Sequence, residues 1–306
     1  MKKSLLWQLA VAAFFLLAAV AALAQKVAIT FDDLPLNGTL PPDVTRTQMT
    51  RDVLEILKNR HLPPVYGFIN SGRLEGDADG AEALKLWAAA GEKVGNHTYL
   101  HMDLHANSAE AFEREIQMNE PALELLTSDS KSWHWFRYPY LREGETLEKR
   151  NAVRQFLRGR GYEIAQVTLD YEDYLWNSPY ARCSAKHNEK AMVWLRSSYL
   201  QFASEYLDKD REMATLVAGR PIQHVLLLHL GAFSKVILPD LLDLLKKKGF
   251  TLVTLEEAQT DPIYQIDPAQ TSQWGGALLD QLMDEKKLKY PAFTAKPYKE
   301  LESICQ

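Results

Sequence analysis

The sequence lacks a basic cluster, nucleotide-binding motifs and internal repeats. Its 306 residues include 35 lysines and arginines against 40 aspartates and glutamates, for a net charge of −5. This mildly acidic balance gives nucleic-acid binding no electrostatic support. No P-loop, glycine-rich dinucleotide fingerprint, repeat or low-complexity segment is present. The 46% hydrophobic content is ample for the core of one domain of barrel size.

Cysteine is scarce, with only Cys183 and Cys305. Neither lies in a cysteine–histidine metal-binding motif, so the sequence offers no cysteine-ligated metal site. In an exported protein the two could form a disulfide that ties the C-terminal segment to the middle of the chain. Two free, buried cysteines are the equally simple alternative.

One long hydrophobic run occurs, at the N-terminus. Lys2 and Lys3 precede the apolar residues 9–23, and Ala22-Leu23-Ala24 fits a signal-peptidase site. We therefore predict that residues 1–24 are a signal peptide cleaved after Ala24 and that the mature protein is periplasmic or secreted. It would meet a membrane only through this segment, and loss of both lysines would change the net charge from −5 to −7. An uncleaved anchor is disfavoured because the first predicted strand begins at Val27 and leaves almost no tether.

Strand and helix patterns then alternate, which predicts an α/β fold in one domain over residues 25–262. Ser108 is expected to open one of the helices. The alternation stops after Pro262, so residues 263–306 are predicted to be a C-terminal extension that serves as a packed brace or a partner surface. The expected strands cover residues 27–31, 65–69, 92–96, 133–136, 162–169, 224–229 and 251–255. The main expected helices cover residues 45–58, 81–90, 146–157, 185–216 (with one possible break), 238–248 and 277–284.

Polar clusters follow five of these apolar strands. In α/β barrels the catalytic residues gather at the C-terminal ends of the strands, because the connecting loops meet there. The recurrence therefore predicts one shared site. The clusters are residues 30–33 (TFDD), 97–101 (HTYLH), 137–140 (RYPY), 170–173 (DYED) and 227–229 (LLH).

The first two clusters predict a catalytic metal site. Asp32 and Asp33 would repel each other at the end of an apolar strand unless a cation compensates, although a solvated pair that caps a helix is the alternative. His97 and His101 are spaced so that both would share one face of a helical turn. With Asp33 they provide three ligands and leave a position for water, as in catalytic metal sites.

Arginine and histidine side chains end two other strands. Arg137 could hold a carboxylate in a fixed orientation, with Asp170 or Asp173 as possible partners, or form an ordinary salt bridge. His229 ends the most apolar strand, where a buried core histidine is the common finding. Its place at a strand end, like the other clusters, favours a catalytic role.

Taken in order, these clusters resemble the polysaccharide deacetylase family, the NodB-homology group of carbohydrate esterases. The family motifs TFDD, H-[ST]-x-x-H, R-x-P-[YFW], D-x-x-D-W and L-x-H all have counterparts here, although Tyr174 replaces the final Trp of the fourth. The resemblance implies a distorted (β/α) barrel and one divalent metal, usually zinc, while cobalt or another first-row ion would also suit the ligands.

By this resemblance, Asp33, His97 and His101 would bind the metal. Asp32 would be the general base that acts on the water activated by the metal. His229 would be the general acid that protonates the leaving amine.

The resemblance also assigns supporting roles. Arg137 would orient Asp32, and Asp173 would brace the motif around Arg137 or His229. Leu227 would line the pocket for the acyl methyl group, and the backbone N–H of Tyr140 would help to hold the oxyanion.

The implied function is an exported metal-dependent hydrolase that removes N-acetyl groups from an acetylated sugar or polysaccharide. The chain departs from the family at Leu34-Pro35, where glycine is frequent, and at Leu230, where an acid is frequent. These departures favour, as alternatives, an O-acetyl esterase or a non-sugar amidase on the same fold. A non-catalytic glycan-binding protein is a third possibility, and nothing in the sequence indicates an oligomeric state.

Overall fold

The computed structural model describes residues 25–127, 129 and 131–306. The predicted signal peptide and its cleavage site lie outside these residues. Within the described ranges, no helix has both the length and the apolar character needed to cross a membrane.

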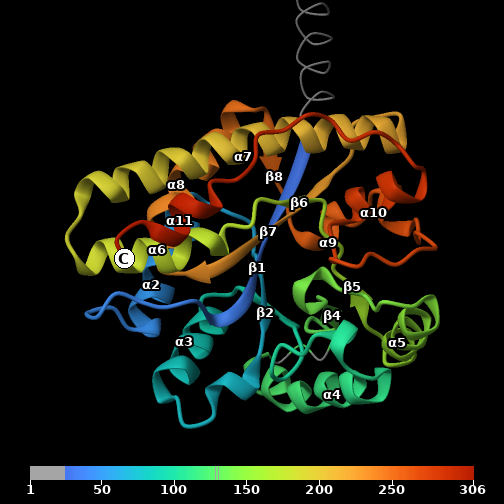
Figure 1. The fold of residues 1–306 in the computed structure, drawn as a ribbon. Helices are drawn as coiled ribbons and strands as arrows, with labels where there is room; N and C mark the ends of the chain where they lie inside the picture. The colour runs from blue at the N-terminus through green and yellow to red at the C-terminus, as the bar shows by residue number, and fades with distance from the viewer. Residues whose placement is uncertain (1–24, 128, 130) are drawn as a thin grey trace, which may run out of the picture.

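Eight parallel strands form one curled sheet at the centre of the molecule (Figure 1). Their order is β5-β4-β3-β2-β1-β7-β6, and β8 also pairs with β1. The end strands β5 and β6 do not pair with each other in the described part of the chain, so the barrel is open on one side, in agreement with the expected distorted (β/α) barrel. The strands are β1 (Gln25–Asn37), β2 (Tyr66–Ile69), β3 (Lys93–Asn96), β4 (Trp135–Phe136), β5 (Glu163–Ile164), β6 (Leu169–Asp170), β7 (His224–Gly231) and β8 (Phe250–Leu252).

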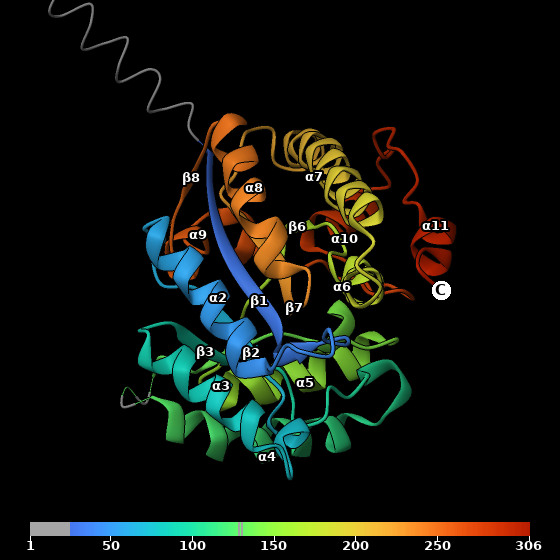
Figure 2. The ribbon, with the colours of Figure 1, turned by 90° about the vertical axis from the view of Figure 1, so that its left-hand side faces the viewer.

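Helices cover the outside of the sheet, and α2 and α8 lie side by side over β1 (Figure 2). The side chain of Ser108 accepts a hydrogen bond from the Ala111 amide and so caps α4, as predicted. The helices are α2 (Arg46–Asn59), α3 (Ala78–Ala89), α4 (Ala109–Leu126), α5 (Leu147–Gly159), α6 (Tyr174–Ala185), α7 (Glu189–Ala218), α8 (Ser234–Lys247), α9 (Leu255–Ala258), α10 (Leu278–Glu285) and α11 (Tyr298–Ser303).

The first strand separates two apolar layers. Val27, Ile29 and Phe31 belong to the large core cluster that the surrounding helices share, whereas Ala28 packs with Val225 and other side chains in a second cluster. Because successive side chains of a strand point to opposite faces, Thr30 and Asp32 follow Ala28 onto the inner face. The strand thereby delivers a carboxylate to the C-terminal mouth of the barrel.

Two predicted elements were wrong in their extent. Residues 162–169 are not one strand: Ala165 N–H donates to Phe136 O and Thr168 N–H to Val225 O, so this segment bridges the two edges of the open sheet. The helix predicted over residues 185–216 corresponds to α7, which begins only after the cap Asn188, and a separate helix that was not predicted, α6, precedes it from Tyr174. The break falls where the Asn188 side chain accepts a hydrogen bond from the Ala191 amide.

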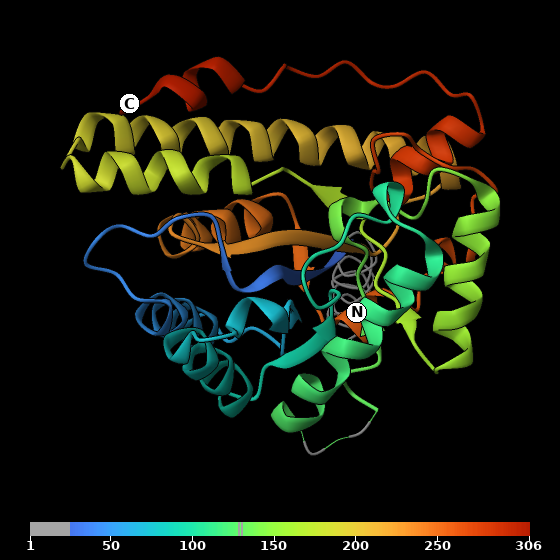
Figure 3. The same ribbon diagram turned by 60° about the horizontal axis from the view of Figure 1, so that its bottom comes forward.

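The C-terminal extension packs on the barrel rather than projecting from it. Leu278, Leu279 and Leu282 of α10 are fully buried, in a cluster with Met213 and Val217 of α7. Figure 3 shows the following segment running beside α7 to α11.

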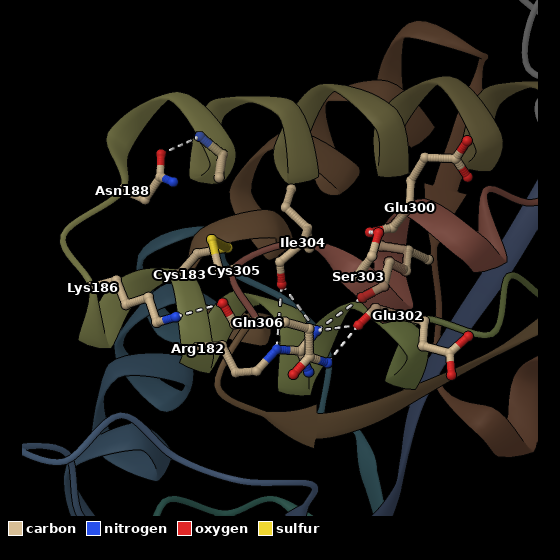
Figure 4. The surroundings of a disulfide bond; sticks show 12 residues. Arg182, Cys183, Lys186, Asn188, Glu300, Glu302, Ser303, Ile304, Cys305 and Gln306 are labelled. Atoms are coloured by element: carbon tan, nitrogen blue, oxygen red, sulfur yellow. Dashed lines mark hydrogen bonds between the residues drawn. A yellow bond between two sulfur atoms is a disulfide. The ribbon is translucent and has the colours of Figure 1, made fainter.

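A disulfide joins Cys183 in α6 to Cys305, the first of the two alternatives raised by the sequence (Figure 4). Around it, the Arg182 guanidinium donates to the carbonyls of Leu301 and Ile304, at 2.9 and 3.2 Å. The end of the extension is thus fastened to α6 by one covalent bond and several polar contacts.

Opening this disulfide should lower the free energy of unfolding. The bond closes a loop across a separation of 122 residues, and loops of this size are typically stabilised by about 2–4 kcal/mol through the restriction of the unfolded chain. Urea melts of the oxidised protein and of a Cys183→Ser/Cys305→Ser double variant would measure the difference. Equal midpoints would contradict a stabilising bridge.

Candidate metal centre

Asp33, His97 and His101 come together at the mouth of the barrel, with one ligand atom of each within 4.8 Å of the others. The Asp33 Oδ1 atom lies 3.3 Å from His101 Nε2 and 3.9 Å from His97 Nε2. Two atoms bound to one ion at about 2.0–2.2 Å can span such separations. The three side chains therefore have the spacing of a divalent-metal site.

A bulge in β1 brings both adjacent carboxylates to this place. The register between β1 and β2 shifts between Phe31 and Leu34, and Asp33 has a φ of 62°. In a regular strand Asp33 would face away from Asp32, whereas a bulge re-aims a side chain. Asn37 Nδ2 then donates to Asp33 Oδ2 at 2.7 Å and leaves Oδ1 directed toward the histidines.

The two histidines do not lie on a helical turn, so that expectation was wrong. His97 follows the last residue of β3, and the chain then turns through a loop in which Thr98 and His101 have φ values of 65° and 61°. Asn70 Nδ2 donates to the carbonyl of Thr98 at 3.0 Å and helps to hold this loop. A loop with left-handed residues, rather than the helical turn suggested by the four-residue spacing, therefore brings His97 and His101 together.

Both imidazoles are held in a form that can bind a metal. His97 Nδ1 donates to the Arg137 carbonyl at 2.7 Å, which leaves Nε2 to face Asp33. Burial, together with the charge of His101, keeps the pKa of His97 well below its usual value. Burial likewise lowers the pKa of His101 to about 4, although Asp33 opposes the shift. Neutral imidazole is the form that coordinates a metal.

Asp33 offers a buried oxygen that accepts no hydrogen bond. Its Oδ1 atom has no donor among the described residues, and the half-exposed Arg73 guanidinium lies 3.4 Å away as an ion-pair partner. Burial would raise the pKa of Asp33, but the facing His101, His229 and His97 lower it below the usual range, so the group is a carboxylate. A buried anionic oxygen without a donor is costly unless a cation compensates, so these residues fit a metal ion.

Arg137 holds the neighbouring carboxylate of Asp32. Its Nη1 atom donates to both Asp32 oxygens at 3.1 and 3.3 Å, while Nη2 donates to Thr30 Oγ1 and Nε to Ala165 O. In the described part of the chain neither Asp170 nor Asp173, the partners suggested by the sequence, bonds to this guanidinium. Burial raises the pKa of Asp32 to about 6, and the charge of Arg137 limits that rise.

His229 lies next to Asp32 and is braced by Asp173. In the parallel pairing of β1 with β7, Asp32 is opposite His229. His229 Nδ1 and its backbone N–H donate to the two Asp173 oxygens, each at 2.8 Å. Burial alone would lower the pKa of His229, but the charge and hydrogen bond of Asp173 outweigh it and raise the pKa to about 9. Nε2 is left as the proton-carrying atom on the other side of the ring.

One cavity with a volume of about 390 Å³ is lined by Asp32, Asp33, His97, His101 and His229, together with Leu227 and Tyr140. Tyr140 has a φ of 59° within a tight turn. Tyr174, which ends the fourth motif, also lines the cavity, as do residues that the sequence did not identify, Arg142 and Trp274 among them. Arg142 closely follows the third motif in the chain and could have been found, whereas Trp274 lies far away in the extension.

Comparison with known proteins supports the resemblance inferred from the motifs. The family model described as polysaccharide deacetylase matches residues 20–156. The chain is 26% identical over 240 residues to a chitin deacetylase of Colletotrichum lindemuthianum, covering 77% of this chain and 79% of that protein. It is 30% identical over 114 residues to a chitooligosaccharide deacetylase of Rhizobium leguminosarum bv. trifolii, covering 37% and 46% of the two chains.

Solved structures share the fold. The Colletotrichum lindemuthianum chitin deacetylase superimposes with a TM-score of 0.52 at 24% identity, covering 81% of this chain and 94% of that one. A family 4 carbohydrate esterase pseudoenzyme of Bacillus anthracis gives a TM-score of 0.52 at 16% identity, covering 77% and 66%. Since a pseudoenzyme has the same fold, any argument for activity must come from the side chains.

Proposed function

We propose that this chain, which belongs to the polysaccharide deacetylase family, is an exported metal-dependent hydrolase that removes N-acetyl groups from an acetylated sugar or polysaccharide. One observation carries the proposal: a candidate ligand set, a buried carboxylate and a braced histidine line the same cavity. The chitin and chitooligosaccharide deacetylases to which the chain is similar support the substrate class.

Asp33, His97 and His101 would hold one divalent ion, zinc in our proposal, although cobalt or another first-row ion also suits these ligands. When bound, such an ion lowers the pKa of water toward neutrality and polarises a carbonyl oxygen. Asn37 and the carbonyl of Arg137 fix two of the ligands in orientation. Such supporting contacts usually matter for metal affinity.

Asp32 would act as the general base. With a pKa of about 6 it is ionised at neutral pH yet basic enough to take a proton from water as the water oxygen bonds to the acetyl carbon. Arg137 keeps the carboxylate in place throughout. The backbone N–H of Tyr140 would stabilise the negative oxygen that develops, and Leu227 would contact the acetyl methyl group.

His229 would act as the general acid. Because its pKa is about 9, it carries the proton at neutral pH and can donate it from Nε2 to the nitrogen of the sugar as the carbon–nitrogen bond breaks. The products are acetate and a free amine. Asp173 keeps the ring oriented and protonated.

Export is the second part of the proposal. The N-terminal basic and apolar segment has the form of a signal peptide, and a disulfide between Cys183 and Cys305 suits an oxidising compartment such as the periplasm or the extracellular space.

Acetate release tests the proposal. Residues 25–306 would be stripped of metal with a chelator, reloaded with zinc or cobalt, and given N-acetylated chitooligosaccharides, peptidoglycan fragments and O-acetylated xylan. We expect release from an N-acetyl sugar that is lost on stripping and restored by metal. Release from O-acetylated xylan alone would favour an esterase instead. No acetate release from any of these glycans, despite one bound metal per chain, would contradict the proposal.

A further inference from the structure

The C-terminal extension forms part of the cavity. Trp274, Gly275 and Gly276 line it together with Asp32 and His229, although more than 40 residues separate them from His229 along the chain. We infer that this segment is a saccharide-binding subsite in which Trp274 stacks on a pyranose ring next to the one that carries the acetyl group. The inference rests on the proposed function and names how the substrate is held.

The backbone of this segment is held close to the turn that contains Tyr140. A Cβ atom on Gly275 would lie 2.4 Å from Tyr140 O and 3.1 Å from Leu141 O, and Gly275 has a φ of +81°. Only glycine allows this approach without displacement of the turn. The extension is therefore in direct contact with the turn whose Tyr140 N–H is proposed to hold the oxyanion.

Residues on the C-terminal side anchor the same segment. Gln281 Nε2 donates to Gly276 O at 3.0 Å, and the Leu278 amide donates to Val167 O at 2.7 Å. Ala277 is buried in a small cluster with Val167 and Leu227. Residues 275–278 are thus packed and hydrogen-bonded to the interior of the barrel, so the backbone next to Trp274 is held in place.

Trp274 itself remains open to solvent. Its exposed fraction is 77%, while Leu278, Leu279 and Leu282 nearby in the chain are fully buried. A tryptophan that packs on so little of the protein has no role in the core. Its place at the mouth of the catalytic cavity gives the exposed ring a ligand-facing position instead.

The surrounding side chains suit a sugar. Tyr140 and Tyr174, exposed by 54% and 40%, line the same cavity. The C–H groups on one face of a pyranose carry partial positive charge and can lie against the negative face of an aromatic ring. Glu172 and Arg142 also line the cavity and offer a hydrogen-bond acceptor and donors to hydroxyl groups. Apolar surface with a few convergent polar groups is typical of a ligand site.

Trp274→Ala tests the subsite. We expect KM for tri-N-acetylchitotriose to rise about tenfold, in line with the loss of one aromatic contact and its buried area. The Kd of the same sugar, measured by calorimetry on zinc-loaded protein in an Asp32→Asn background, should rise equally. Turnover of the small ester 4-nitrophenyl acetate should change by less than about twofold. Trp274→Phe should keep most of the affinity.

Phe293→Ala is the matched control, since Phe293 is an aromatic side chain of the same extension, 52% exposed, that contacts Tyr206 and does not line the cavity. Its affinity for the sugar should equal that of the parent protein. Unchanged binding in Trp274→Ala, or no binding of the sugar to the parent, overturns the subsite. Binding that depends on Trp274 without any acetate release would instead support the subsite and contradict the deacetylase.

Discussion

An Asp32→Asn protein should bind its metal normally and yet lose about 10²–10⁴-fold in kcat. The amide has nearly the shape of the carboxylate and can still accept a hydrogen bond from Arg137, which lies 3.1 Å from Asp32 Oδ1. It cannot take a proton from water. Because the cluster of Asp33, His97 and His101 does not include Asp32, the metal ligands remain complete.

The adjacent carboxylate provides the control. Asp33→Asn removes a predicted ligand, so activity and metal should be lost together. Metal content after dialysis and acetate release would be measured on both variants, with circular dichroism to verify folding. Full activity in Asp32→Asn would show that Asp32 is not the general base. Loss of metal from Asp32→Asn but not from Asp33→Asn would show that Asp32 is the ligand and Asp33 the base.

An Asp173→Asn protein should lose activity mainly at alkaline pH. In the parent, His229 has a pKa of about 9 because the charge and hydrogen bond of Asp173 outweigh its burial. A general acid works only while protonated, so kcat should remain high up to about pH 9 and decline above it. Without the carboxylate, burial lowers the pKa of His229, and the alkaline limb should move to lower pH by roughly 1–3 units. At pH 8 the loss in kcat should then be roughly twofold for a shift of one unit and roughly tenfold for a shift of two units.

The pH profile separates this role from a merely structural one. Glu172→Gln removes a charge one residue away, but Glu172 bonds to Lys296 and Tyr298 rather than to His229. Its alkaline limb should stay close to that of the parent. If Asp173→Asn lowered kcat at every pH without moving the alkaline limb, Asp173 would only support the loop and would not set the pKa of His229.

The sequence was most informative about which strands carry the polar residues. Apolar runs ending in Asp32, Arg137 and His229 were recognisable, and parallel strands bring their C-terminal ends to one edge whatever the details of the loops. The family resemblance assigned Asp32 as the partner of Arg137, but the residues alone did not, because Asp32 lies on a strand that is not adjacent to β4 and becomes a neighbour only when the sheet curls.

The hydrophobic and polar pattern of the sequence did not predict local backbone conformations in the site. Alternation would place Asp32 and Asp33 on opposite faces, and only the bulge before Leu34 lets both reach the cavity. The spacing of His97 and His101 fits a helix as well as a loop, and the left-handed conformation of Thr98 that decides between them leaves no signature in a non-glycine residue.

The extension illustrates a different limit. Its apolar residues, Leu278 and Leu282 among them, indicate that it packs against something, but hydrophobic contact is not directional and does not identify the surface. The contact of Gly275 with the turn at Tyr140 depends on a tertiary arrangement of segments over 130 residues apart. The sequence alone therefore could not assign Trp274 to the site, whereas the fold does.

The part of the cavity lining that residues 274–276 supply is synthesised late. Residues 274–276 are made after every strand of the barrel, so the nascent protein can complete its sheet and bring the candidate ligands together while the cavity still lacks one side. The candidate ligands can therefore converge before the saccharide-binding surface is complete.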